Sequence, residues 1–131
     1  MPRARRALWT GLLLAFALLP TARAQQATER YIPLGRSPGL SPAETRIGEI
    51  EAVDPEARRL ALAGADGRFA VQVGESTRIW LDRTALGRSN AEGSLADCHP
   101  GRTAEVHFAR PGGGPLAAWI KLRIEGPGAG P

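Results

Sequence analysis

Cys98, His99 and His107 are the side chains of this sequence best suited to hold a metal ion. Zinc and copper accept a thiolate and imidazole nitrogens as ligands, and a nearby aspartate would complete a set of four. The spacing of the three residues matches no known metal site, and a histidine that points outward from a strand is usually only solvated. Zinc or copper binding is therefore our second hypothesis for function, and we expect no resident cofactor.

Trp80 and Trp119 form a second candidate set, because Arg78, Lys121 and Arg123 accompany them in the strand pattern. Aromatic and basic side chains on a small barrel can stack on oligonucleotides or sugars and hold them. The alternative is that one tryptophan fills the core while the other covers an edge beneath the stems of its basic neighbours. The charge balance described below favours this alternative.

We define the candidate interaction surface by five residues, namely Trp80, Asp82, Arg83, Trp119 and Lys121. Periodicity places Trp119 and Lys121 on the outer face of the last strand, whereas it does not settle the side that Trp80 takes. Asp82 and Arg83 begin a long irregular stretch. Loops of that length in a small domain are usually functional or contain a short helical turn.

Ser89, Ser94, His99 and His107 could be arranged with a carboxylate into a catalytic triad. No nucleophile elbow, zinc-binding helix or phosphate loop accompanies them. The glycines at 112–114 lack the lysine and the following helix that a phosphate cradle requires, and they are typical of a hairpin tip. We therefore expect the protein not to be an enzyme.

The first 24 residues have the order of a cleavable secretory signal. Its parts are basic residues at Arg3, Arg5 and Arg6, an apolar run from Ala7 to Leu19, and the small-residue site Ala22-Arg23-Ala24. The apolar run is too short to cross a bilayer as a helix. We expect cleavage after Ala24, no stable membrane anchor after processing, and a protein that is periplasmic or secreted.

The charge balance changes once this signal is removed. Four of the 17 lysines and arginines lie in it, which leaves 13 against 13 aspartates and glutamates. A neutral chain with mixed signs lacks the basic surface that nucleic acid or anionic membranes require. We therefore expect no nucleic-acid partner.

Cys98 is the only cysteine of the 131-residue chain, so it has no intramolecular disulfide partner. We expect a half-buried small residue at the entry to a strand. A reactive or intermolecular thiol is the alternative.

The sequence divides into a signal (1–24), an extended leader (25–45), one domain (46–125) and a tail (126–131). Prolines and glycines without a sustained period predict that the leader is neither helix nor strand. Tyr31, Ile32 and Leu34 are apolar enough for part of this arm to lie along the domain. The Gly/Pro-rich tail is expected to be disordered.

Short alternating segments separated by turns predict an all-β domain, a small antiparallel barrel or sandwich, of which we favour the barrel. In the segment 46–53, Val53 interrupts the alternation of inward and outward side chains, which predicts a bulge near Ala52. Asp66-Gly67 is a hairpin signal. The inward residues that we expect on the later segments are Phe69, Val71, Val73, Ile79, Leu81, Ala104, Val106, Phe108, Ala118, Ile120, Leu122 and Ile124, with Glu105, His107, Trp119, Lys121 and Arg123 outward.

Four stretches resemble uncharacterised bacterial secreted proteins with a small OB-like barrel, namely Gly48 to Asp54, Thr77 to Asp82, Leu95 to Val106 and Ala118 to Lys121. This resemblance implies an OB-like barrel of five to six strands and no particular activity. The layout is more distantly similar to the periplasmic copper-chaperone OB domain. That family uses methionine ligands, whereas the only methionine here is Met1, which leaves with the signal.

Our first hypothesis is an exported envelope protein that acts as a non-enzymatic binding or adaptor module. Its partner would be another envelope protein, docked along an exposed strand edge or on the loop from Asp82 to Gly101. Pairing along an open edge requires no special side chains, which fits the absence of a chemical motif. The sequence leaves open the oligomeric state and the role of the arm from Tyr31 to Leu40.

Overall fold

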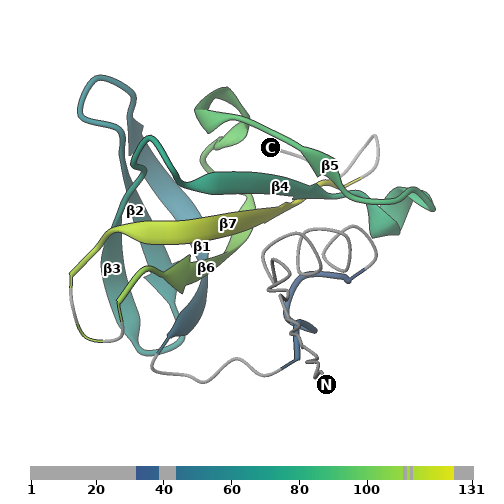
Figure 1. Cartoon of the computed structure of the whole chain (residues 1–131), viewed down its shortest axis with the longest axis horizontal. Coiled ribbons are helices and arrows are strands. Elements are labelled where there is room, and N and C mark those ends of the chain that lie inside the picture. The colour runs from purple at the N-terminus through teal and green to yellow at the C-terminus, as the bar shows by residue number, and fades with distance from the viewer. Residues whose placement is uncertain (1–31, 39–43, 111, 113, 126–131) are drawn as a thin grey trace, which may run out of the picture.

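The computed structural model describes residues 32–38, 44–110, 112 and 114–125, and in that part of the chain it is all-β. The strands are β1 (Thr45–Asp54), β2 (Arg59–Gly64), β3 (Gly67–Gln72), β4 (Arg78–Asp82), β5 (Ala91–Glu92), β6 (Thr103–Phe108) and β7 (Ala117–Arg123). They form one seven-stranded sheet in the order β3-β2-β1-β6-β7-β4-β5 (Figure 1). No helix among these residues is long and apolar enough to cross a membrane.

The predicted all-β class is confirmed, whereas the predicted number and pairing of strands are wrong. The sheet has seven strands rather than five to six, and β4 pairs in parallel with β7, although the other pairs are antiparallel. Because β3 and β5 end the order, the sheet is not a closed barrel. A single bridge between Gln72 and Leu116 links the end of β3 to the start of β7. Alternation identifies the faces of a strand but not its neighbour, so the sequence did not reveal the parallel pair.

The bulge that was predicted near Ala52 is present. Ile50 pairs with Leu62 and Ala52 with Ala61, so Glu51 is the extra residue on β1. The extra residue returns Val53 to the inner face, where it packs against the core. Asp54 ends the strand, and its Oδ1 accepts hydrogen bonds from the backbone N–H groups of the turn at residues 56 and 57.

The predicted hairpin at Asp66-Gly67 connects β2 and β3, one residue earlier than the sequence suggested. Gly64 pairs with Gly67, so the two loop residues are Ala65 and Asp66. The positive φ of 122° falls on Gly67, directly after the loop. A side chain would be strained in this backbone conformation, so glycine is needed there.

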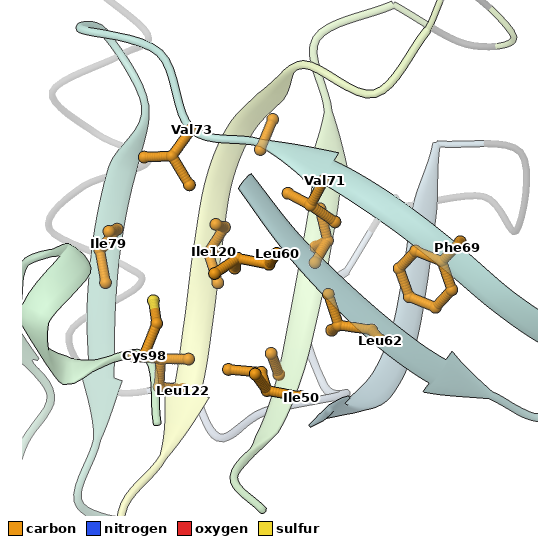
Figure 2. Packing of buried hydrophobic residues seen from close by; sticks show 13 residues of the cluster. Ile50, Leu60, Leu62, Phe69, Val71, Val73, Ile79, Cys98, Ile120 and Leu122 are labelled. Carbon is orange, nitrogen blue, oxygen red and sulfur yellow. The ribbon is translucent and has the colours of Figure 1, made fainter. Parts of the chain in front are cut away.

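The core lies on one face of the curved sheet (Figure 2). Its members are Ile50, Leu60, Leu62, Phe69, Val71, Val73, Ile79, Cys98, Ala104, Val106, Ala117, Ile120 and Leu122. Ala117 stands where Ala118 was expected, because the pairing shifts between His107 and Phe108. Ala118 is the additional residue of this second bulge, so the inward positions at the start of β7 move by one.

The long stretch from Asp82 to Gly101 contains regular structure of its own. Two 3-10 turns, η1 (Thr84–Leu86) and η2 (Leu95–Asp97), flank the short strand β5. Ser94 and Asp97 form a capping box that satisfies backbone groups at the start of η2. Of the two alternatives for this loop, a functional role or short helical turns, the structure shows the helical turns. The signal (1–24), Tyr31, the stretch 39–43 and the tail (126–131) lie outside the described residues.

Candidate functional site

Residues 32–38, which we call the arm, contact the face of β4, β6 and β7 that turns away from the core (Figure 1). The arm makes a tight turn in which the N–H of Arg36 donates to the carbonyl of Pro33 at 3.1 Å. Gly35 has a φ of 82°, as the third position of a type II turn requires. Leu34 at the tip is only 6% exposed, so the turn inserts an apolar side chain. The expected docking of the leader on the domain is confirmed for this residue.

Two buried carboxylates hold the main chain of this turn. Asp82 Oδ2 accepts a hydrogen bond from the N–H of Leu34 at 2.8 Å, and Glu105 Oε1 accepts one from Gly35 at 3.2 Å. Both side chains are buried among the strands. Buried carboxylates must be hydrogen-bonded or paired to remain ionised, and the arm supplies two such donors.

Two buried donors hold the carbonyl end of the same turn. Lys121 Nζ and Asn90 Nδ2 each donate to the carbonyl oxygen of Ile32 at 3.0 Å, and Lys121 also contacts Ser37 Oγ at 3.2 Å. Lys121 is fully buried (0% exposed), which is rare for a lysine. Register places Lys121 directly opposite Glu105 on β6. The arm therefore rests on a set of buried charges of both signs.

The charge state of Asp82 follows from these contacts. Burial by itself would raise the pKa of its carboxyl group. Hydrogen bonds from the backbone of Leu34 and from the hydroxyl and backbone of Thr84, together with the charge of Lys121, outweigh burial and hold the pKa below its usual value of 3.8. Asp82 is therefore ionised at neutral pH and attracts the Lys121 ammonium group.

The structure divides the candidate interaction surface. Trp80 is 5% exposed, and Asp82 and Lys121 are buried, whereas Arg83 and Trp119 remain half-buried. Lys121 and Glu105 do turn away from the core, as the alternation predicted, but the arm covers them. Lys121 and Glu105 therefore lie on the outer face of the sheet without being exposed. Arg83 is used locally, since its Nε donates to the carbonyl of Ser89 at 2.9 Å.

Sequence reasoning missed Asn90 and Glu105 as partners of the arm. Asn90 lies 58 residues from Ile32 in the sequence, and Glu105 lies 70 residues from Gly35. Neither belongs to a recognisable motif. The apolar tip of the arm at Leu34 was the available signal, and it identified the segment that docks but not the residues beneath it.

The three proposed metal ligands are not brought together. Cys98 is 4% exposed in the core, and burial, reinforced by the charge of Asp97 and opposed by Arg102, raises the pKa of its thiol to about 11. The neighbouring His99 is exposed. A thiol with this pKa is protonated at neutral pH and is a poor metal ligand and nucleophile. Cys98 is more deeply buried than the half-buried position we expected.

His107 lies on the other face of the sheet, stacked on Trp119. Their ring centroids are 5.3 Å apart and the ring planes differ by 17°. Nδ1 of His107 is 3.3 Å from the hydroxyl of Thr45. Over the ranges that the structure describes, no three His, Cys, Asp or Glu residues form a group that could hold a metal ion.

A groove of roughly 360 Å³ opens beside β3. We call it the β3 groove, and its lining residues are Arg46, Phe69, Ala70, Phe108, Arg110, Gly112, Gly114 and Pro115. The Arg46 guanidinium lies over the Phe69 ring, 4.0 Å from its centroid. Phe69 in turn meets the ring of Phe108 edge to face, with 6.3 Å between centroids. The groove thus combines cationic and aromatic side chains.

Glycines position the Phe69 ring at the floor of this groove. Gly48 and Gly64 pair across β1 and β2, and the ring lies over both. A Cβ atom at Gly48 would be 2.8 Å from the carbonyl oxygen of Ala63 and 3.0 Å from the edge of the Phe69 ring. The ring can lie this low only because β1 has no side chain at that position.

Comparisons with known proteins yield little for this chain. No family model matches it, and no curated protein matches it. A solved structure of a copper(II)-bound variant of CusF from Escherichia coli, residues 10–88, is similar with a TM-score of 0.42 and 13% identity. The alignment covers 60% of this chain and 89% of that one. A similarity of this size supports no functional conclusion.

Proposed function

We propose that the protein is an exported, non-enzymatic binding module that accepts an extended segment of another envelope protein as an extra strand along β3. The observation that carries this proposal is the position of β3 at the end of the sheet order, with the β3 groove beside it. Export is inferred from residues 1–24. An edge strand presents backbone donors and acceptors that another chain can use.

The hydrogen bonds of β3 indicate which residues would pair with such a segment. The N–H of Gln72 points away from β2, since it donates to the carbonyl of Pro115 at 2.7 Å. Backbone groups two residues apart on a strand point in the same direction. The N–H and C=O groups of Ala70 therefore point toward the groove that this residue lines. A partner strand would form its hydrogen bonds at this residue.

The β3 edge is favoured over the Asp82–Gly101 loop as the docking place. Asp82 and Asn90 hold the arm, and the loop backbone is folded into η1, β5 and η2. A partner at the loop would have to displace contacts that the protein already makes. A partner at β3 would fill a groove instead.

Peptide binding to the isotope-labelled mature protein tests the proposal. The probe is a capped peptide of alternating threonine and valine, and the matched control carries an N-methyl group on every residue, which removes the donors of both edges. We expect amide chemical-shift changes at Arg68–Gln72 with the probe and none with that control. Shifts that are absent at millimolar probe, or equal for both peptides, would contradict strand addition.

A further inference from the structure

We propose that the β3 groove selects an acidic segment, whose carboxylate binds between Arg46 and Arg110 while the segment lies along β3. This inference rests on the proposed function and names the partner's chemistry. Among the described residues that line the groove there are two arginines and two phenylalanines, and none of these residues is acidic. The site is therefore positively charged, whereas the backbone groups of a strand edge carry no net charge.

The positive charge of the groove is not neutralised within the described residues. The two ion pairs found there join Arg68 to Glu51 at 2.8 Å and Arg78 to Glu92 at 2.7 Å. Arg46 and Arg110 take part in neither pair. A carboxylate from outside would thus meet two cations that the described chain has left without an anion.

The Phe69 ring positions one of these cations for a carboxylate. A guanidinium carries its five N–H groups in its own plane, and an aromatic face beneath it uses none of these donors. Stacking also limits the rotamers of Arg46, so less entropy is lost when an anion binds. Carboxylates and guanidinium groups form two parallel hydrogen bonds in this geometry.

A carboxylate fits better than a nucleic-acid phosphate backbone. The groove offers two cations beside a strand edge and two rings, whereas binding along a phosphate backbone requires a longer basic stripe. Its volume of roughly 360 Å³ is at the small end of ligand sites and suits a few residues of an extended chain. Alternating acidic and apolar side chains would place carboxylates toward the arginines and leave the backbone for β3.

The test compares three capped peptides of equal length on the labelled mature protein, with valine alternating with glutamate, threonine or lysine. We expect the glutamate peptide to bind about tenfold more tightly than the threonine peptide, since charged hydrogen bonds are stronger than neutral ones. Its affinity should fall as salt is raised from 50 to 300 mM, and the lysine peptide should bind most weakly.

Charge-reversal variants show where in the molecule the preference for the glutamate peptide arises. Arg110→Glu should remove the preference for the glutamate peptide while leaving the threonine peptide unchanged. Arg88→Glu is the matched control, because Arg88 is an exposed arginine of the Asp82–Gly101 loop and the change in net charge is the same. Arg88→Glu should leave the preference intact. Arg46→Gln provides a second variant within the groove.

The outcomes separate the two proposals. If the glutamate and threonine peptides bind equally and Arg110→Glu changes neither, acid selection is wrong and strand addition stands. If no peptide shifts the amides of β3, strand addition is wrong as well. If inorganic phosphate shifts the same amides and competes as well as the glutamate peptide, the groove binds anions without reading a peptide, which overturns the inference.

Discussion

The arm-covered face and the β3 groove place a cation beside an aromatic ring in two different settings. Lys121 Nζ lies 5.5 Å from the centroid of Trp119, and the Arg46 guanidinium lies 4.0 Å from that of Phe69. At Lys121 the chain supplies acceptors from its own arm. At Arg46 the groove remains open. Both regions thus pair a cation with an aromatic ring, and they differ in whether the chain itself supplies acceptors to that cation.

The largest effect that tests this contrast is expected for Lys121→Met. Methionine keeps the apolar volume, but it leaves Asp82 and Glu105 buried without the ammonium group. Removing one partner of a buried ionic set costs about 3–5 kcal/mol. Urea unfolding followed by tryptophan fluorescence measures the loss. Arg123→Met, on the same strand and half-buried, is the control and should cost under about 1 kcal/mol. Equal losses for both would mean that the arm-covered face is not held by charge.

A smaller effect is expected for Leu34→Ala at the tip of the arm. Truncating a buried leucine costs about 2–5 kcal/mol in a rigid core. We expect about 2 kcal/mol here, because the arm can detach and the loss cannot exceed its docking free energy. Hydrogen exchange at the amides of Leu34 and Gly35 should accelerate in the variant while Val106 stays protected. Uniform acceleration at all three amides would contradict separate opening of the arm.

Acid should weaken the arm-covered face through Asp82. The pKa of this carboxyl group is below its usual value of 3.8 in the folded state, so its contribution to stability is complete above about pH 4 and is lost as pH falls through the folded-state pKa. Asp82→Asn should reduce the free energy of unfolding by about 1–3 kcal/mol at pH 7. The wild-type and variant curves should converge at low pH. A constant difference from pH 7 to pH 2 would show that Asp82 does not act through its charge.

The smallest effects are expected in the β3 groove. Arg110→Ala should change the free energy of unfolding by less than about 0.5 kcal/mol, because the exposed side chain holds no other described residue. Arg46→Ala should cost about 0.5–1 kcal/mol through its contact with Phe69. Thermal unfolding of both variants measures these two changes in stability. A loss above 2 kcal/mol at Arg110 would place it among the structural residues and remove the contrast between the two regions.

Alternation predicted the inner face of the sheet well, since positions such as Val71, Val106 and Ile120 are buried where it placed them. It was less useful for the outer face, because periodicity separates two faces without showing what covers either. Lys121 and Glu105 were expected to point outward, which they do, but the segment that buries them lies 70 to 89 residues away in the sequence. The β3 groove was equally hidden, because it depends on which strand lacks a neighbour.

The parallel pairing of β4 with β7 places the last described strand inside the sheet order rather than at its end. β7 joins β6 to β4, so a nascent chain that stops before Ala117 leaves these two strands without their common neighbour. The sheet can therefore be completed only after the whole domain has been synthesised. Chains dominated by such distant contacts fold slowly, in roughly milliseconds to seconds.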